Sequence, residues 1–203
     1  MILRFGFLVL GATILVSCAS LVAPQPVAER AALRGGAYTL DPAHASVIFK
    51  IDHLGFSTYV GRFEALDASL DFEVGKPETT RLEAHVEIAS LDIANDEFAE
   101  TLIGSDWFDA ETFPQATFQS KAITVTGDNT GTMTGALTLK GETREVMFDV
   151  VFNGGDRDLI RGAYVVGFSA KGVIDRTAFG IDRFSGVVGN NVVLEIEAEF
   201  LKQ

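Results

Sequence analysis

The chain has 203 residues, of which 47% are hydrophobic and only 5 are proline, a composition typical of one globular domain rather than a disordered chain. Its 28 acidic residues outnumber its 16 basic ones, and the formal charge of -12 disfavours nucleic acid and anionic membrane surfaces as partners. Because there is only 1 Cys, a framework of disulfides is excluded.

The first residues have the pattern of an export signal. Arg4 precedes an apolar run, residues 5–16, that is too short to span a bilayer core of about 30 Å. The next cysteine closes the tetrapeptide Leu-Val-Ser-Cys, which resembles a bacterial lipobox, where the cysteine is acylated and becomes the first residue of the mature protein. We therefore expect a lipoprotein signal peptide at residues 1–17 and a lipid on Cys18. A chance cysteine beside an ordinary secretory cleavage site is the alternative.

The expected lipid fixes the expected location. A lipidated Cys18 would anchor the protein to a membrane in the periplasm, and the Ala19 that follows it favours the outer membrane. Residues 18–37 contain Pro24 and Pro26 and show no alternation, so we expect a flexible tether there. Residues 38–203 are predicted to form one domain.

Five segments of that domain alternate apolar and polar residues, with the period of two that a half-buried strand requires. Their apolar positions are Val47, Phe49 and Ile51; Leu66, Ala68, Leu70 and Phe72; Leu82, Ala84, Val86 and Ile88; Val146, Phe148, Val150 and Phe152; and Val192, Leu194, Ile196, Ala198 and Phe200. Residues 75–77, Gly-Lys-Pro, predict a turn between the second and third segments, which should pair as a hairpin.

Turn residues indicate further strands. Residues 127–129 separate strands predicted at 116–126 and 132–140, and residues 153–156, Asn-Gly-Gly-Asp, predict a turn before a strand within 159–174. Helical spacing is confined to residues 92–107. The sequence therefore predicts an all-β domain of about eight strands with one short helix. Strands with one polar face must pack against one another, in a closed barrel or a sandwich.

The sequence contains none of the common catalytic motifs of hydrolases or nucleotide-binding enzymes. His44, His53 and His85 could bind zinc if the strands brought them together, but His85 lies on a polar face and we predict no metal site. His53 continues the inward series that ends at Ile51, so we expect it to point into the barrel or to be a hydrogen-bonded residue at its rim.

Residues spaced along most of the domain resemble the bacterial YceI-like family. The similar segments are residues 41–49 (DPAHASVIF), 53–57 (HLGFS), Gly61, Phe63, residues 107–109 (WFD), 113–114 (FP), 117–120 (TFQS), 135–141 (GALTLKG), 176–177 (RT) and 179–180 (FG). They occur in the family's order over roughly residues 38–200. Ala45 and Trp107 depart from the residues usual in the family.

The resemblance implies an extended, lipocalin-like antiparallel β-barrel with an elongated apolar cavity. It also implies binding of a polyisoprenoid, an isoprenoid quinone or a fatty-acid-like chain in the periplasm, without a cofactor or an enzymatic activity. Some members of the family are associated with cytochrome b561-type proteins, which makes such a membrane protein a candidate partner.

Two kinds of residue are the predicted ligand-binding residues of this chain. Inward-facing apolar side chains would contact the ligand's chain, because each methylene buried there contributes about 0.8 kcal/mol. They are Phe49, Ile51, Phe63, Phe118, Phe148 and Phe179, with Leu66, Leu70 and Val86 beside them. Hydrogen-bond donors at the mouth would contact the head group, and the candidates are His53, Arg62, Arg176 and Arg183.

Two other functions stay open from the sequence. The barrel could isomerise, cyclise or oxidise a bound isoprenoid with His53 or Asp52 as the base, and a strongly shifted pKa inside the cavity would favour this. Alternatively, the domain could be a surface interaction module whose Phe side chains fill the barrel, and a cavity too small for a chain would favour that. The sequence also leaves the oligomeric state open.

Overall fold

The computed structural model describes residues 26–27, 29 and 32–203. The predicted signal peptide, Cys18 and most of the predicted tether lie outside the described residues, so what was predicted for them stays a prediction. Within the part that is described, no helix is long and apolar enough to cross a membrane.

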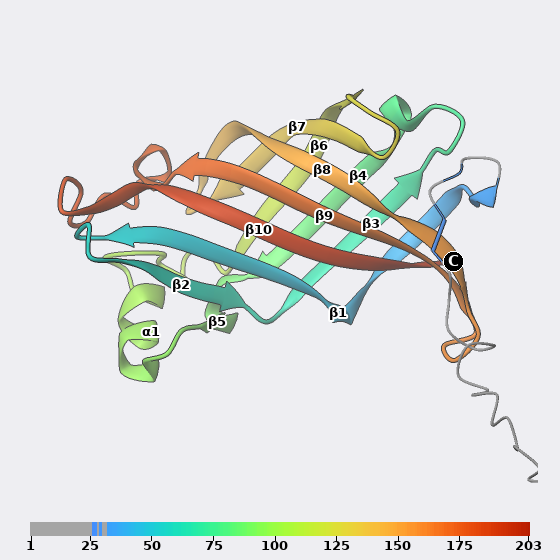
Figure 1. Ribbon diagram of the computed structural model, residues 1–203. Coiled ribbons are helices and arrows are strands. Elements are labelled where there is room, and N and C mark those ends of the chain that lie inside the picture. Colours follow the sequence, from blue (N-terminus) through green and yellow to red (C-terminus); the bar gives the residue numbers. More distant parts are fainter. Residues whose placement is uncertain (1–25, 28, 30–31) are drawn as a thin grey trace, which may run out of the picture.

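Strands make up most of the described chain (Figure 1). They are β1 (Gly36–His53), β2 (Ser57–Phe63), β3 (Leu66–Phe72), β4 (Arg81–Glu87), β5 (Leu91–Asp92), β6 (Gln115–Val125), β7 (Thr130–Leu139), β8 (Glu142–Asp158), β9 (Ala163–Asp175) and β10 (Val188–Lys202). The helical elements are α1 (Asp96–Ile103) and three 3₁₀ turns, η3 (Pro77–Thr79), η4 (Ile88–Ser90) and η5 (Arg176–Phe179).

Eight strands close into a barrel. Antiparallel neighbours follow the order β10-β9-β8-β7-β6-β4-β3-β1, and β1 then pairs with β10. The length of β1 makes this closure possible, because one edge pairs with β10 along most of the strand while Gly36–Thr39 pair on the other edge with β3. Each strand of this ring therefore has a partner on both sides. The prediction of an all-β, lipocalin-like antiparallel barrel of about eight strands with one short helix is confirmed.

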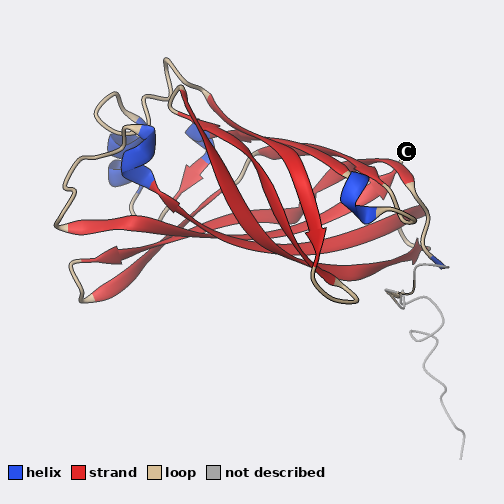
Figure 2. Cartoon of the chain, turned by 90° about the horizontal axis from the view of Figure 1, so that it is seen from above, coloured by secondary structure: helices blue, strands red, loops and turns tan. Residues whose placement is uncertain are grey.

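A short extension lies beside the barrel. β2 pairs with the second half of β1, and β5 pairs with β2. The tight turn before β2 places Leu54 at φ 61 and Gly55 at φ 71, the left-handed backbone that the two central residues of a type I′ turn require. We call this end of the barrel the distal end, because α1 also lies there, away from the C-terminus (Figures 1 and 2). The other end, where β6, β8 and β10 finish, is the proximal end.

The predicted local elements mostly match. β3 and β4 form the predicted hairpin, with Leu70 opposite Leu82. β6 and β7 flank the predicted turn at 127–129. The predicted helical segment contains α1, whose first turn is capped by Asn95, since its side-chain oxygen accepts a hydrogen bond from the Phe98 backbone N–H.

The predicted turn at residues 153–156 is wrong. β8 runs through these residues, and the turn to β9 follows at 159–162. The pairing of β8 with β9 shifts register between Phe152 and Gly154, and Gly154 has φ 117. Asn153 and Gly154 therefore form a β-bulge rather than a turn. A side chain at Gly154 would also lie 3.0 Å from Pro26, so the glycine permits close approach of the N-terminal segment.

Two hydrophobic clusters fill parts of the barrel interior. The distal cluster contains Ile88, Leu91, Ile93, Leu102, Trp107, Phe118, Met133, Leu139, Val146, Phe148, Ile174, Phe179, Ile181 and Val192. The proximal cluster contains Tyr38, Leu40, Ala68, Leu70, Phe72, Tyr164, Val166 and Phe200. The half-buried residues Leu82 and Ala84 pack against both clusters.

Candidate ligand-binding cavity

A cavity of about 280 Å³ lies inside the barrel, where the two clusters meet. All eight strands of the barrel contribute to its wall, and nearly all the side chains in that wall are apolar. Leu40, Leu70, Phe72 and Phe200 reach it from the proximal cluster, and Phe118, Met133 and Phe148 from the distal cluster. The wall can therefore solvate a hydrocarbon chain but offers little to a polar ligand.

The alternation seen in the sequence produces this wall. Successive side chains of a strand point to opposite faces, so every second residue of a barrel strand faces inward. On β8 the inward residues that line the cavity are Phe148, Val150 and Phe152. On β10 they are Leu194, Ile196, Ala198 and Phe200.

On β8 and β10 the cavity lining ends at one register. On β8 it stops at Phe148 and on β10 it stops at Leu194. Both residues pair with Gly172 of β9. The next inward residues, Val146 and Val192, do not line the cavity and belong to the distal cluster. On β7 the lining extends farther, to Leu137.

Phe118 and Phe148 are the last inward residues of β6 and β8 that line the cavity, and we call this pair the floor. The rings of Phe118 and Phe148 meet edge to face with 5.5 Å between their centroids, a favourable arrangement for two aromatic rings. Both are buried, with exposed fractions of 8% and 5%. On β6 and β8 the lining therefore ends at two rings that contact each other.

We call the part of the lining near the proximal end, where the pairing of β4 with β6 stops, the mouth. These strands pair only over residues 83–87 and 115–119, and the Leu82 N–H then donates a hydrogen bond to Ser120 Oγ at 2.8 Å. Beyond that point, the cavity is bounded on one side by Val74, Pro77 and Thr80 and on the other by Val125, Gly127, Asp128, Asn129 and Thr130. Most of the polar side chains of the lining gather here.

The structure separates the predicted apolar contacts into two sets. Phe118 and Phe148 line the cavity, as do Leu66, Leu70 and Val86. The other four predicted residues, Phe49, Ile51, Phe63 and Phe179, pack in or against the distal cluster and do not line the cavity. Phe179 is only 1% exposed. The cavity does not extend to these four residues, so their contact with a ligand stays a prediction.

Arg176, a predicted head-group donor, is buried and fully engaged with the backbone. Its guanidinium donates hydrogen bonds to the carbonyls of Ile181 at 2.6 Å, Gly189 at 2.9 Å, Arg183 at 3.0 Å and Val188 at 3.2 Å. Burial lowers the pKa of this guanidinium. Its geometry is that of a residue that shapes the segment between η5 and β10.

The other predicted donors also lie away from the cavity lining. Arg62 is exposed and bonds to Asp92 and Glu64, each at 2.7 Å. Arg183 pairs with Asp106. His53 is exposed, and its ring lies 6.1 Å from that of Tyr59. Residues at the mouth were missed, although the turn residues 127–129 marked their place in the sequence.

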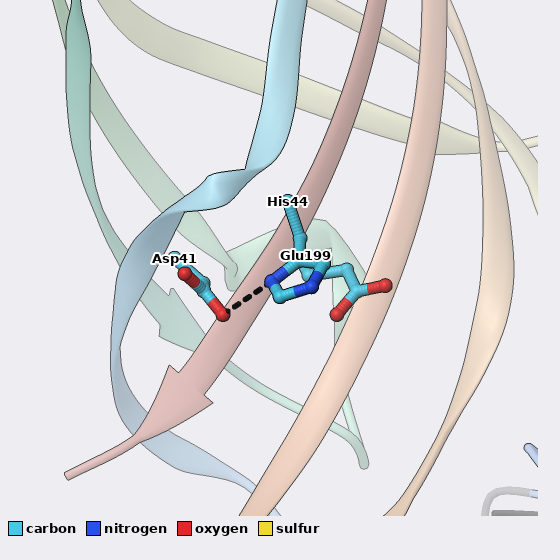
Figure 3. Close-up of side chains that lie close together, drawn as sticks. All are labelled: Asp41, His44 and Glu199. Carbon is cyan, nitrogen blue, oxygen red and sulfur yellow. Dashed lines mark hydrogen bonds and ion pairs between the residues drawn. The ribbon is translucent and has the colours of Figure 1, made fainter. Parts of the chain in front are cut away.

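A charged cluster lies on the proximal side of the barrel, and Figure 3 draws three of its residues, Asp41, His44 and Glu199. His44 Nδ1 is 2.8 Å from Asp41 Oδ2, and Arg161 contacts Asp41 at 2.8 Å, Glu199 at 2.7 Å and Asp158 at 2.6 Å. Within the described residues, Asp41, His44 and Glu199 place possible metal-ligand atoms within 4.8 Å of one another. Because the Arg161 guanidinium already pairs with both carboxylates, this arrangement is better explained as an ion-pair network. His53 and His85 are not part of it.

Comparison with known proteins gives one family. The YceI-like domain matches residues 38–200. A UPF0312 protein of Staphylococcus epidermidis is 34% identical over 169 residues, which cover 80% of this chain and 96% of that protein. A UPF0312 protein of Pseudomonas putida is 34% identical over 160 residues, which cover 79% and 82%.

Solved structures agree in fold. BcnA of Burkholderia cenocepacia has a TM-score of 0.72 at 26% identity and covers 79% of this chain and 98% of its own. A Campylobacter jejuni YceI protein has a TM-score of 0.65 at 29% identity, with coverage of 76% and 91%. A polyisoprenoid binding domain from Saccharophagus degradans has a TM-score of 0.63 at 11% identity and covers 82% and 98%, which shows likeness of fold alone.

Proposed function

Because this chain belongs to the YceI-like family, we propose that it binds one apolar chain of a polyisoprenoid, or of another long-chain amphiphile, inside its barrel. The observation that carries the proposal is the cavity of about 280 Å³, walled by apolar side chains from all eight strands. A domain whose Phe side chains merely filled the barrel would have no such space. The function is binding by burial, with no covalent step.

The energetics favour a chain of moderate length. Each buried methylene contributes about 0.8 kcal/mol, and association costs on the order of 4–15 kcal/mol. Roughly ten buried methylenes therefore offset the lower part of that cost. The cavity is just below the usual range of about 300–1,000 Å³ for ligand sites. A longer ligand would keep part of its chain, with its head group, at or beyond the mouth.

Two further observations support binding over the alternatives. The fold is shared with the polyisoprenoid binding domain of Saccharophagus degradans. Asp52 and His53, the bases considered for an isoprenoid-modifying enzyme, are exposed at the distal end and do not line the cavity. A cytochrome b561-type membrane protein remains the partner that the family resemblance predicts.

The proposal includes a lipid anchor on Cys18 and a periplasmic location. The lipobox-like residues 15–18 support it. The first described residues are Pro26 and Val27, and Val27 pairs with Gly155 of β8. Residues 18–25 span at most about 30 Å when extended, so an anchored Cys18 would keep β8 within that reach of the bilayer.

Native mass spectrometry tests the binding proposal. The full chain carrying Cys18→Ser, which cannot be lipidated, is purified from a bacterial periplasm and its bound lipids are extracted. We expect a stoichiometric adduct with the mass of a prenyl or acyl compound. Val150→Glu, which places a charge in the cavity wall, should abolish the adduct, whereas Met147→Glu, on the outer face of the same strand and 56% exposed, should keep it.

Both variants need a thermal unfolding curve to show that they fold. A mass that stays that of the unliganded protein, even after incubation with prenyl alcohols, isoprenoid quinones and fatty acids, would refute the proposal. In that case the surface interaction module becomes the better function.

A further inference from the structure

The floor of the cavity is a built feature rather than a chance contact. Phe118 comes from β6 and Phe148 from β8, so two strands separated by β7 each contribute one ring, and the two rings meet. The cavity lies toward the mouth, and beyond the rings most of the interior is packed with the distal cluster, although Leu137 of β7 still lines the cavity there. The ring pair therefore lies between most of the cavity and most of the packed cluster.

Each ring packs closely against a glycine of a neighbouring strand. A Cβ on Gly172 would lie 2.7 Å from Phe148 Cδ1, and a Cβ on Gly135 would lie 2.5 Å from Phe118 Cε2. No real side chain tolerates such contacts with a fixed ring, so each ring lies against the bare backbone of a glycine. Since the edge-to-face contact also orients the rings, neither can move without disturbing the other.

We propose that the Phe118–Phe148 pair sets the longest chain that the protein accepts, an inference that rests on the proposed function. A chain entering from the mouth extends inward until its end meets the two rings. A shorter chain leaves apolar wall uncovered, and a longer one leaves methylenes in water, where they add nothing to the affinity. Affinity should therefore rise with chain length up to a limit and then level off or fall.

A series of prenyl alcohols of increasing length tests the proposal in competition binding to the Cys18→Ser chain. Phe148→Ala removes one ring of the floor and opens room for about one isoprene unit, so the preferred alcohol should be one unit longer. The preference for the longer over the shorter alcohol should rise by about tenfold. Phe118→Ala should act in the same direction.

A filling variant tests the same limit from the other side. Ala170 lines the cavity between the mouth and the floor, opposite Val150 of β8. Ala170→Leu should shorten the preferred alcohol without removing any ring from the core. This variant and Phe148→Leu keep the test decisive if the alanine variants fail to fold.

Phe108→Ala is the matched control. Phe108 packs against the distal cluster, with its ring 5.9 Å from that of Phe63, and it does not line the cavity. Its removal should leave the preferred length unchanged. The length limit is refuted if the floor variants keep the wild-type preference, or if Phe108→Ala shifts it equally. If the wild-type chain binds no alcohol, quinone or fatty acid, the proposed function fails as well.

Discussion

Arg161 joins three parts of the chain through one guanidinium. It pairs with Asp41 of β1, Glu199 of β10 and Asp158 at the end of β8. Burial alone would lower the pKa of Arg161, but the hydrogen bonds to Asp158, Glu199 and Asp41 outweigh it and raise the pKa. The arginine is therefore charged at every pH at which the protein folds, and it needs its carboxylates to remain ionised.

Asp41 makes this network sensitive to acid. The hydrogen bonds from His44 and Arg161 lower the pKa of Asp41. Its contribution to stability is therefore complete above the unfolded-state pKa of about 3.9 and is lost as the pH falls through the lower folded-state value. We expect Asp41→Asn to reduce the free energy of unfolding by about 1–2 kcal/mol at pH 7. Urea denaturation should show a smaller difference from wild type below a pH of about 3.

The control for this prediction is Asp149→Asn. Asp149 is an exposed residue of β8, and its replacement should change the free energy of unfolding by less than about 0.5 kcal/mol. A loss for Asp41→Asn that is equally large at pH 7 and pH 3 would contradict the ionic origin of the effect.

At this same scale, the sequence could not show which arginines are free to bind a head group. Arg62, Arg176 and Arg183 all adjoin motif residues, and each was a reasonable donor to a head group. Whether a guanidinium is free depends on carbonyls and carboxylates brought near by folding, as the four carbonyls around Arg176 show. Local spacing contains no information on such partners.

At the scale of elements, two glycines of β9 differ in whether a side chain would fit. At one of them a Cβ would clash with its neighbours, and at the other it would not. A Cβ at Gly172 would lie 2.7 Å from the Phe148 ring and 2.8 Å from the Met147 carbonyl oxygen. A Cβ at Gly167 of the same strand would meet its nearest neighbour, Asn153 Cβ, at an ordinary 3.5 Å. We expect Gly172→Ala to lower the free energy of unfolding by about 1–3 kcal/mol through overpacking.

Gly167→Ala is the comparison, and it should be neutral within about 0.5 kcal/mol. Thermal or urea unfolding of the two variants measures both effects. If the two variants lost equal amounts of unfolding free energy, the effect of Gly172→Ala would come from the backbone alone. The contact of Gly172 with the Phe148 ring would then have no effect on stability.

Strands were predictable because alternation is a local property. The inward faces of β3, β4, β8 and β10 follow from the period of two, and so does the β3–β4 hairpin. The Asn-Gly-Gly-Asp segment was mistaken for a turn because glycines serve both turns and bulges. Only the pairing of β8 with β9 on both sides of Gly154 decides between them.

At the scale of the whole molecule, the sequence did not show how far along the barrel each inward-facing residue lies. Phe49 and Phe148 both point inward on their strands, yet only Phe148 lines the cavity. Their difference arises from the stagger of the strands and from the packing of Phe63 and Phe179 at the distal end. Periodicity identified the inward face, but the position of the floor depends on the closed barrel.

The charge of the whole chain and the composition of the mouth together predict the head group. The described residues that line the cavity include no Lys or Arg, the mouth includes Asp128, and the formal charge is -12. A prenyl phosphate would therefore meet net repulsion. We expect a prenyl alcohol to bind at least about tenfold more tightly than the phosphate of equal chain length in competition binding. Asp128→Asn should reduce this difference in affinity, and Asp149→Asn on the outer wall should leave it unchanged. Equal affinity of the wild-type chain for alcohol and phosphate would contradict the prediction, because a cationic group would then have to contact the phosphate at the mouth.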